Sequence, residues 1–133
     1  MERGLPQMLN NFYEDLELGR KAEYLALGVF RKIAPACNFS HVGNDRDCYY
    51  KGDIKAITID GKEYFIEIKD DKCIWKTGNV LCEDEVFYKE RGYFGKGNMQ
   101  GESDFYCVVS RQERKIYCFD FEKMRKHYKQ GRF

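Results

Sequence analysis

The chain has 133 residues, a length at which one domain with a single hydrophobic core is the usual arrangement, so we expect one domain over residues 1–133. Charged residues form 34% and aromatic residues 16% of the sequence, a mixture too apolar for a disordered tail. The formal net charge is only +1, so any nucleic-acid-binding surface has to come from local clusters of basic residues.

The sequence carries no sign of a membrane or secreted protein. No apolar run approaches the roughly 20 residues that span a bilayer, and no signal-like segment follows Met1. The six cysteines, at positions 37, 48, 73, 82, 107 and 118, include no C-x-x-C pair that would suit zinc. We therefore expect a cytoplasmic protein with reduced thiols, in which Cys107 and Cys118 act as small buried hydrophobic residues within strands.

The first predicted element is a helix between Leu9 and Ile33, which Pro35 ends. A seam of residues recurs along it at alternating three- and four-residue steps. Its members are Leu9, Phe12, Leu16, Gly19, Glu23, Ala26, Phe30 and Ile33. Because an unpaired carboxylate in such a seam costs several kcal/mol, Glu23 should have a partner. Either Arg20, Lys21 or a lysine on the sheet pairs with it, or Glu23 belongs to a functional site.

A hairpin follows a segment from Asn38 to Gly52 that is polar and mostly loop, although Tyr49-Tyr50 could begin a strand. The predicted strands run from Asp53 to Ile59 and from Glu63 to Asp70. They are separated by Asp60-Gly61, the strongest short hairpin signal.

The second half of the chain continues as strands. A turn at Lys76-Thr77-Gly78-Asn79 leads to a third long strand that reaches about Tyr88 and extends the meander, and the glycine-rich residues 91–103 form a loop. The strand pair Phe105–Val109 and Lys115–Phe119 precedes a helix over Phe121–Gln130, with Met124 inward and most of its basic residues, including Arg125, outward. The predicted fold is α+β, with a central mixed, largely antiparallel sheet flanked by helices.

Charged residues on the second strand of the hairpin are candidates for chemistry. Glu67 and Lys69 are two residues apart, so they share one face of the strand, while Ile66 and Ile68 take the other. A plain amphipathic strand has the same pattern. A two-residue turn would place Asp53 opposite Ile68 and on the wrong face. We therefore predict an irregularity, either a three-residue connection with Gly61 in the left-handed conformation or one bulge, that brings Asp53 toward Glu67 and Lys69.

Two carboxylates and an ammonium group on one patch suit phosphodiester hydrolysis, because carboxylate oxygens bind Mg²⁺ and the cation stabilises charge beside the attacking water. The spacing Asp53, thirteen residues, Glu67-Ile68-Lys69 resembles the PD-(D/E)XK nuclease superfamily, which has the restriction-endonuclease-like fold. The resemblance covers roughly residues 15 to 130. It implies that Asp53 and Glu67 bind Mg²⁺, with Mn²⁺ as a substitute, that Ile68 offers its backbone carbonyl, and that Lys69 orients or activates water.

Two more features match phage-type and resolvase-like members of this superfamily. Glu23 lies in a Gly19-x-x-x-Glu23 setting like the one from which the first helix often supplies a further acidic ligand. Thr77-Gly78-Asn79-x-x-x-Glu83 is similar to an element after the Glu-x-Lys strand, and Ser103-Asp104 to a later pair that opens a strand. The resemblance implies that Lys76, Thr77 and Asn79 contact the DNA backbone and that Glu83 is an outer-shell ligand or orients Lys69. A simple turn explains Thr77-Gly78-Asn79 equally well.

The sequence therefore predicts a metal-dependent nuclease that acts on DNA, of a kind found in phages or mobile elements. Branched or single-stranded substrates and a homodimer remain open. Two alternatives are a catalytically inactive nucleic-acid-binding or assembly module on the same fold, and a plain interaction domain. Candidates for phosphate contacts are Lys76, Arg91, Lys96 and Arg132. The loop residues His41, Asp45 and Asp47 are interpreted as solvated side chains rather than metal ligands.

Overall fold

A computed structural model of the 133-residue chain describes all residues except 1–4, 44–50, 72–73, 79–84, 89–92, 97–100 and 130–133. Side chains are described for residues 19–43, 51–71, 74, 76–78 and 101–128. The elements in chain order are α1 (Leu5–Ile33), β1 (Asn38–His41), β2 (Ile54–Ile57), β3 (Glu63–Asp70), α2 (Ile74–Thr77), β4 (Glu85–Tyr88), β5 (Tyr93–Lys96), β6 (Phe105–Ser110), β7 (Lys115–Asp120) and α3 (Phe121–Lys129).

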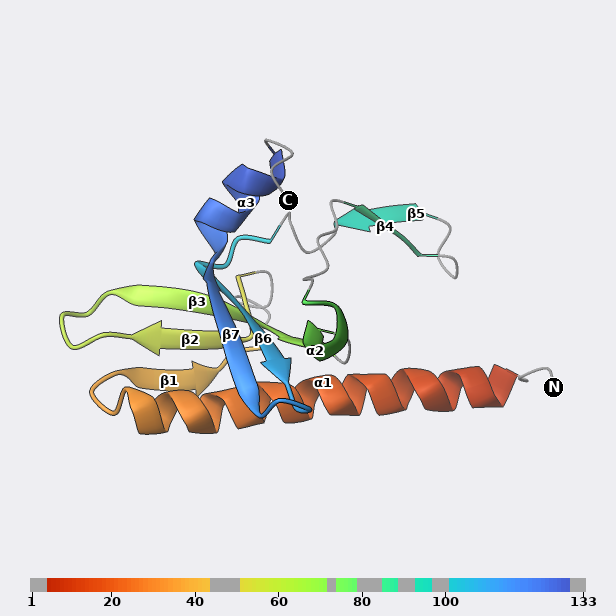
Figure 1. Cartoon of the computed structure of the whole chain (residues 1–133), viewed down its shortest axis with the longest axis horizontal. Coiled ribbons are helices and arrows are strands. Elements are labelled where there is room, and N and C mark those ends of the chain that lie inside the picture. Colours follow the sequence, from red (N-terminus) through yellow and green to blue (C-terminus); the bar gives the residue numbers. More distant parts are fainter. Residues whose placement is uncertain are drawn as a thin grey trace.

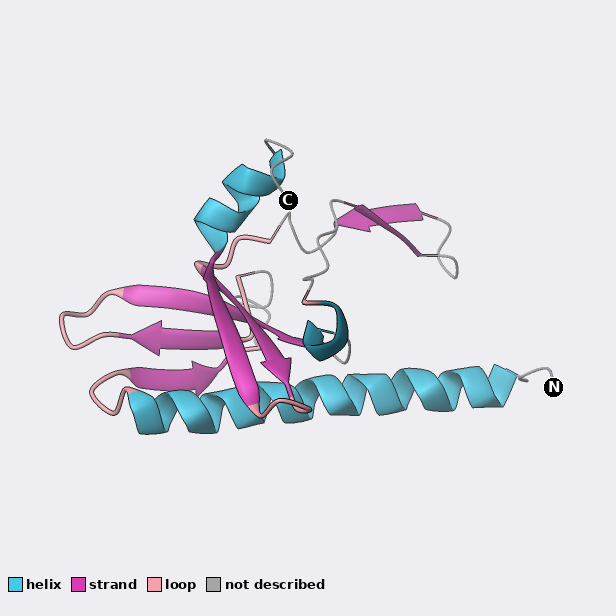
Figure 2. Cartoon of the chain, viewed as in Figure 1, coloured by secondary structure: helices cyan, strands magenta, loops and turns pink. Residues whose placement is uncertain are grey.

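The described strands form a five-stranded sheet in the order β1-β2-β3-β6-β7 and a separate pair, β4-β5 (Figure 2). Neighbouring strands in the large sheet are antiparallel except for β3 and β6, which are parallel. A parallel pair needs a crossover connection, and here that connection contains α2 and the β4-β5 pair. The predicted α+β class with a mixed, largely antiparallel sheet is confirmed.

Helices cover the two faces of the sheet (Figure 1). On one face, α1 contributes Ala22, Ala26, Leu27 and Phe30 to a core that includes Ile66 and Ile68 of β3 and Cys107 and Val109 of β6. On the other face, Phe121 and Met124 of α3 pack with Tyr106 and Val108 of β6. Since β6 is covered on both faces, its residues are apolar without alternation.

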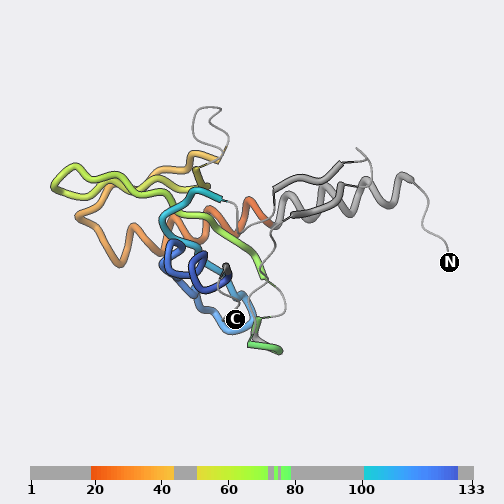
Figure 3. The backbone as a smooth tube through the Cα atoms, turned by 90° about the horizontal axis from the view of Figure 1, so that it is seen from above, coloured from red at the N-terminus to blue at the C-terminus, as the bar shows by residue number. Residues whose placement is uncertain are grey.

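The predicted first helix is confirmed, and its seam is confirmed over Ala26 and Phe30, which are buried. Ile33, the last seam residue, is 72% exposed, so its predicted burial is wrong. The helix ends at Ile33, and Ala34 donates its N–H to the Phe30 carbonyl at 2.9 Å before the chain turns toward β1. Ile33 therefore points away from the core, although Phe30 in the same turn is part of it and Ala34 packs against it. Figure 3 shows this end of α1 and the tip of the β2-β3 hairpin at the same end of the molecule.

Four sequence predictions are corrected by the structure. The segment from Asn38, predicted to be mostly loop, contains β1. Phe39 is the only buried residue of this strand, so its sequence has no apolar alternation, and pairing with β2 stabilises it. Residues 93–96, within the predicted glycine-rich loop, form β5. The strand after β3 does not extend the meander, because β6 occupies that side of β3. Cys107 is buried as predicted, but Cys118, directly opposite on β7, is exposed.

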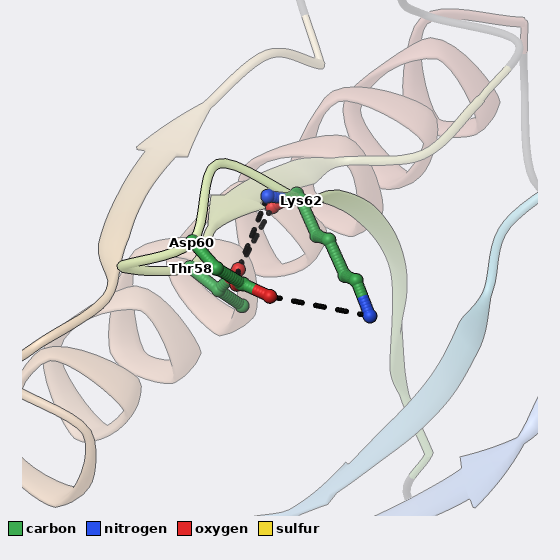
Figure 4. Close-up of polar contacts among 3 residues, drawn as sticks. All are labelled: Thr58, Asp60 and Lys62. Carbon is green, nitrogen blue, oxygen red and sulfur yellow. Dashed lines mark hydrogen bonds and ion pairs between the residues drawn. The ribbon is translucent and has the colours of Figure 1, made fainter.

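The turn of the β2-β3 hairpin is irregular in the way the sequence predicted. Ile57 pairs with Glu63, and the N–H of Thr58 bonds to the Lys62 carbonyl at 2.9 Å, which leaves three residues in the connection. Gly61 has the left-handed φ of 84°. The Thr58 hydroxyl donates to Asp60 and accepts the Lys62 N–H at 3.2 Å (Figure 4). This odd connection sets the register along the whole hairpin.

Candidate active site

A bulge precedes β2 at Asp53. Ile54 pairs with Ile66, and the N–H of Asp53 also donates to the Ile66 carbonyl at 2.9 Å, so two residues of one strand oppose one of the other. Both predicted irregularities are therefore present. The three-residue connection alone would turn Asp53 to the Glu67 face, and the bulge adds a further shift. As a result the Asp53 carboxylate meets the β3 backbone, where its Oδ2 accepts the N–H of Ile68 at 2.8 Å.

Glu67 and Lys69 share one face of β3. Ile66 and Ile68, which alternate with them, are buried in the core beneath α1, so Glu67 and Lys69 project to the face opposite α1. Glu67 is half-buried beside Tyr106 of β6 in the strand register, and Lys69 is exposed. The sequence prediction that these two charged residues share a face is confirmed.

Glu23 reaches the same end of the sheet from α1. Its Oε1 lies 3.0 Å from Nε2 of His41, and the exposed fractions of the two side chains are only 15% and 12%. Glu23 is also close enough to Asp53 to raise the pKa of the Asp53 carboxyl group. The partner expected for Glu23 is therefore present, and it includes His41, which sequence reasoning placed in a solvated loop. The role of His41 could have been predicted from the pairing of β1 with β2, because this pairing places the end of β1 beside the start of β2.

The carboxyl groups influence one another strongly. Burial raises the pKa of Asp53 to about 7, with opposition from the Ile68 N–H and further raising by Glu23. Burial also raises the pKa of Glu67 to about 8, with the charges of Asp53 and Glu23 adding to the rise and Lys69 opposing it. At neutral pH the site therefore holds carboxyl groups that ionise fully only if positive charge is supplied. A divalent cation is one source of that charge.

The donor types at this site suit a hard divalent cation, because such ions prefer carboxylate oxygens. The geometry is less complete. Within the part of the chain whose side chains are described, no three carboxylate, imidazole or thiol groups are arranged to hold a metal ion as they stand. Glu23 comes from the α1 side and Glu67 projects to the other face, with Asp53 between them. The donor chemistry thus fits Mg²⁺, while a ready-made ligand cage is not found among these residues.

The other predicted site residues follow β3. Lys76 and Thr77 are exposed on α2, which begins where Asp71 accepts the N–H of Ile74 at 3.1 Å. Gly78, with a φ of 67°, ends this helix, so the predicted turn falls at Gly78. Several predicted residues lie outside the described residues or side chains, namely Asp45, Asp47, Asn79, Glu83, Arg91, Lys96 and Arg132.

Ser103-Asp104 opens β6 as predicted, and its described contacts are structural. The buried Ser103 hydroxyl donates to the Lys51 carbonyl at 2.6 Å. The Asp104 carboxylate accepts the N–H of Phe65 at 2.8 Å, and the Asp104 N–H donates to the Phe65 carbonyl at 2.8 Å. Arg125 of α3 was predicted to point outward, but it donates to the Ser103 carbonyl at 3.1 Å and is half-buried. These bonds fix the start of β6 against β3.

A cavity of about 580 Å³ lies between α1 and the β6-β7 hairpin, away from these carboxylates. Apolar side chains such as Leu25, Val29 and Ile116 line it, and Glu23, Asp53, Glu67 and Lys69 are not among its lining residues. This cavity and the cluster of carboxyl groups with raised pKa values are therefore separate features of the molecule.

Comparisons with known proteins bear on the fold. No protein-family model matches the chain, and no curated protein matches it significantly in sequence. Among solved structures, the chain is similar to a bacterial homing endonuclease, I-Ssp6803I, with a TM-score of 0.54 and 14% sequence identity. The match covers 81% of this chain and 70% of the endonuclease. It shows a shared fold and fits the restriction-endonuclease-like core that the sequence predicted.

None of the helices that the structure describes combines the length and apolar character needed to cross a membrane.

Proposed function

We propose that this chain is a divalent-cation-dependent deoxyribonuclease with a site of the PD-(D/E)XK type. The observation that carries the proposal is the juxtaposition of Glu23, Asp53 and Glu67. Glu23 comes from α1, Asp53 directly precedes β2 and Glu67 lies on β3, and the three carboxyl groups interact electrostatically. The charge of Lys69 opposes the rise in the pKa of Glu67. Carboxyl groups with perturbed pKa values are concentrated at functional sites. The homing endonuclease that shares the fold supports DNA as the substrate.

In this proposal Asp53 and Glu67, with Glu23 and the Ile68 carbonyl, would hold Mg²⁺ or Mn²⁺, which lowers the pKa of bound water and polarises the phosphate. The bond from the Ile68 N–H fixes the orientation of the Asp53 carboxylate. Lys69, exposed next to Glu67 on the same face, positions the attacking water and stabilises the charge that develops on phosphate oxygens. The products should carry 5′-phosphates, as the resemblance implies.

The DNA backbone would be held beside this site. Lys76 and Thr77 are exposed on α2, directly after β3, where they suit contacts that position phosphates without reading sequence. The same proposal includes Asn79 as a further DNA contact and Glu83 as an outer-shell group. It also includes branched or single-stranded DNA as substrates, and a homodimer that reaches two DNA strands.

A catalytically inactive DNA-binding or assembly module on the same fold is the second candidate. It is favoured by one observation, that no three donor groups among the described side chains are arranged to hold a metal ion as they stand. Such a module would bind DNA through basic residues and leave the phosphodiester bond intact. The two candidates therefore differ in whether the DNA is cut.

The experiment is incubation of the protein with end-labelled linear, circular and branched DNA in Mg²⁺, Mn²⁺ or EDTA. We expect cleavage only with a divalent cation. Lys69→Ala and Glu67→Gln should each reduce the rate by at least about 100-fold, as losses of electrostatic stabilisation do. Matched controls are Lys62→Ala in the hairpin turn and Glu63→Gln at the other end of β3, both exposed, which should cut like the wild type.

Two results would contradict this proposal. Equal cutting by wild type and Lys69→Ala would indicate a contaminating nuclease or another site. DNA binding without cutting under all cation conditions would favour the inactive module.

A further inference from the structure

His41 lies at the end of the sheet where the carboxyl groups meet. It is the last residue of β1 and pairs with Ile54 of β2. The next residue, Val42, donates its N–H to the Asp53 carbonyl at 2.9 Å. The backbone therefore fixes His41, at the end of β1, beside the residues where β2 begins, and Asp53 directly precedes them. The side chain of His41 reaches back toward Glu23 of α1.

The contact between His41 and Glu23 joins Nε2 of the ring to Oε1 of the carboxyl group at 3.0 Å. When Glu23 binds a cation as a carboxylate it only accepts hydrogen bonds, so Nε2–H of His41 is then the donor. Both neutral histidine with the proton on Nε2 and the imidazolium form supply this donor. Since both side chains are largely shielded from water, the bond does not compete with a full hydration shell.

Two neighbours restrict the His41 ring. Tyr24 stacks on it, with ring centroids 4.8 Å apart and planes 21° from parallel. Gly43 leaves the space that the pair needs, because a Cβ there would lie 3.0 Å from Glu23 Oε1 and 3.3 Å from ring atoms of His41. The strand and the stacked Tyr24 ring thus restrict the imidazole, in a space that stays open because residue 43 is glycine.

Glu23 requires such a restraint. It lies near two other acidic groups, and its charge raises the pKa of Asp53 and of Glu67. Like charges in a partly buried site repel, and a glutamate side chain can relieve repulsion by rotating toward solvent. A hydrogen bond from the restrained His41 ring to the Glu23 carboxylate opposes that rotation and keeps Glu23 beside Asp53.

We propose that His41 is a positioning residue that holds the Glu23 carboxylate at the cation site through its Nε2–H. This inference rests on the proposed nuclease function and adds to it a residue outside the Asp-Glu-x-Lys pattern. Partners that orient metal-binding groups commonly contribute 10- to 100-fold to metal affinity or activity. His41 should act in the same range, through Glu23 and without touching DNA.

The test compares His41→Ala with His41→Gln, which keeps an N–H donor on a side chain of similar reach. We expect His41→Ala to lower kcat by about 10- to 100-fold with KM for DNA within about twofold, and to weaken Mn²⁺ binding, measured by electron paramagnetic resonance, by about tenfold. His41→Gln should recover most of both losses. His127→Ala, at an exposed position on α3, is the matched control and should match the wild type.

A second variant keeps the test decisive if His41→Ala does not fold. Gly43→Ala retains His41 but adds a methyl group that crowds both Glu23 Oε1 and the imidazole ring, so it should also weaken Mn²⁺ binding and lower kcat, by several-fold. The inference is overturned if wild type cuts DNA while the His41 and Gly43 variants retain its kcat and Mn²⁺ affinity, or if His41→Gln is no better than His41→Ala. If wild type neither cuts DNA nor binds Mn²⁺, the nuclease proposal is wrong and this inference is wrong with it.

Discussion

Gly52 lies so close to the backbone of Ile66 that a Cβ atom at position 52 would be 2.9 Å from the Ile66 carbonyl oxygen. Its φ of 151° is also one that residues with a side chain rarely adopt. This close approach occurs at the bulge, directly before Asp53 donates to the same carbonyl. The position of Asp53 therefore depends on glycine at 52.

Gly52→Ala should destabilise the fold by about 2 kcal/mol, and Gly52→Pro by more, because a proline ring holds φ near −65°. The measurement is urea-induced unfolding followed by circular dichroism. Gly28→Ala is the control, since Gly28 is exposed in α1 with no atom near its would-be Cβ, and it should stabilise by roughly 0.5–1 kcal/mol. Equal stability of Gly52→Ala and the wild type would show that the bulge tolerates a side chain.

Much of the fold could be predicted from local pattern. The helical seam in α1, the alternation in β3, the apolar run of β6 and the Asp60-Gly61 turn are each signals within one segment, so the predicted boundaries of these elements agree closely with the structure. β1 and β5 carry no such signal, because these four-residue strands are stabilised by pairing with a neighbouring strand rather than by a sequence pattern of their own. The parallel pairing of β3 with β6 was missed for the same reason, since no residue in either strand specifies its neighbour.

The candidate site could be predicted less completely. Glu67 and Lys69 share a face by strand alternation, and Glu23 was singled out by its position in an apolar seam. His41 was missed because its role comes from pairing between β1 and β2, which brings a loop-like sequence beside α1. The bulge at Asp53 was predicted only as one of two alternatives, and both occur, because turn length and strand register are independent properties.

The free energy of unfolding of the cation-free protein should decrease as pH rises from about 5 to about 9. A carboxyl group whose pKa is raised in the folded chain binds its proton more tightly there than in the unfolded chain. Protonation therefore stabilises the fold below the unfolded pKa, and this contribution is lost as pH rises through the folded pKa. The folded values are about 7 for Asp53, against 3.8 ordinarily, and about 8 for Glu67, against 4.5.

Urea unfolding in EDTA across this pH range measures the effect. The double variant Asp53→Asn, Glu67→Gln should reduce the pH dependence, because neither amide titrates. Glu63→Gln, on the same strand but exposed, should leave it unchanged. A wild-type stability that increases between neutral and alkaline pH would contradict the assigned direction of both pKa shifts.

Asp104 should stabilise the junction of β3 and β6. Its carboxylate accepts the N–H of Phe65, and Asp104→Ala leaves that donor without its partner, so we expect a loss of about 1 kcal/mol in thermal or urea unfolding. Asp104→Asn keeps an acceptor oxygen and should lose less. Glu102→Ala, an exposed substitution two residues before Asp104, should change stability by no more than about 0.5 kcal/mol. Equal effects of Asp104→Ala and Glu102→Ala would mean that this hydrogen bond contributes nothing measurable.

Cys118 should react with iodoacetamide well before Cys107. The two residues are opposite each other on β7 and β6, and their sulfur atoms are 2.9 Å apart. The hydrogen bond from Cys107 lowers the pKa of Cys118, whereas the same bond and burial raise the pKa of Cys107. Because the thiolate is the reactive form and Cys118 is exposed, its alkylation rate at neutral pH should exceed that of Cys107 by at least about tenfold. Peptide mass spectrometry of timed samples measures both rates.

A Cys107→Ala variant tests the cause of this reactivity. It removes the hydrogen-bond donor and should slow alkylation of Cys118. An unchanged rate in that variant would show that exposure alone controls the reactivity of Cys118.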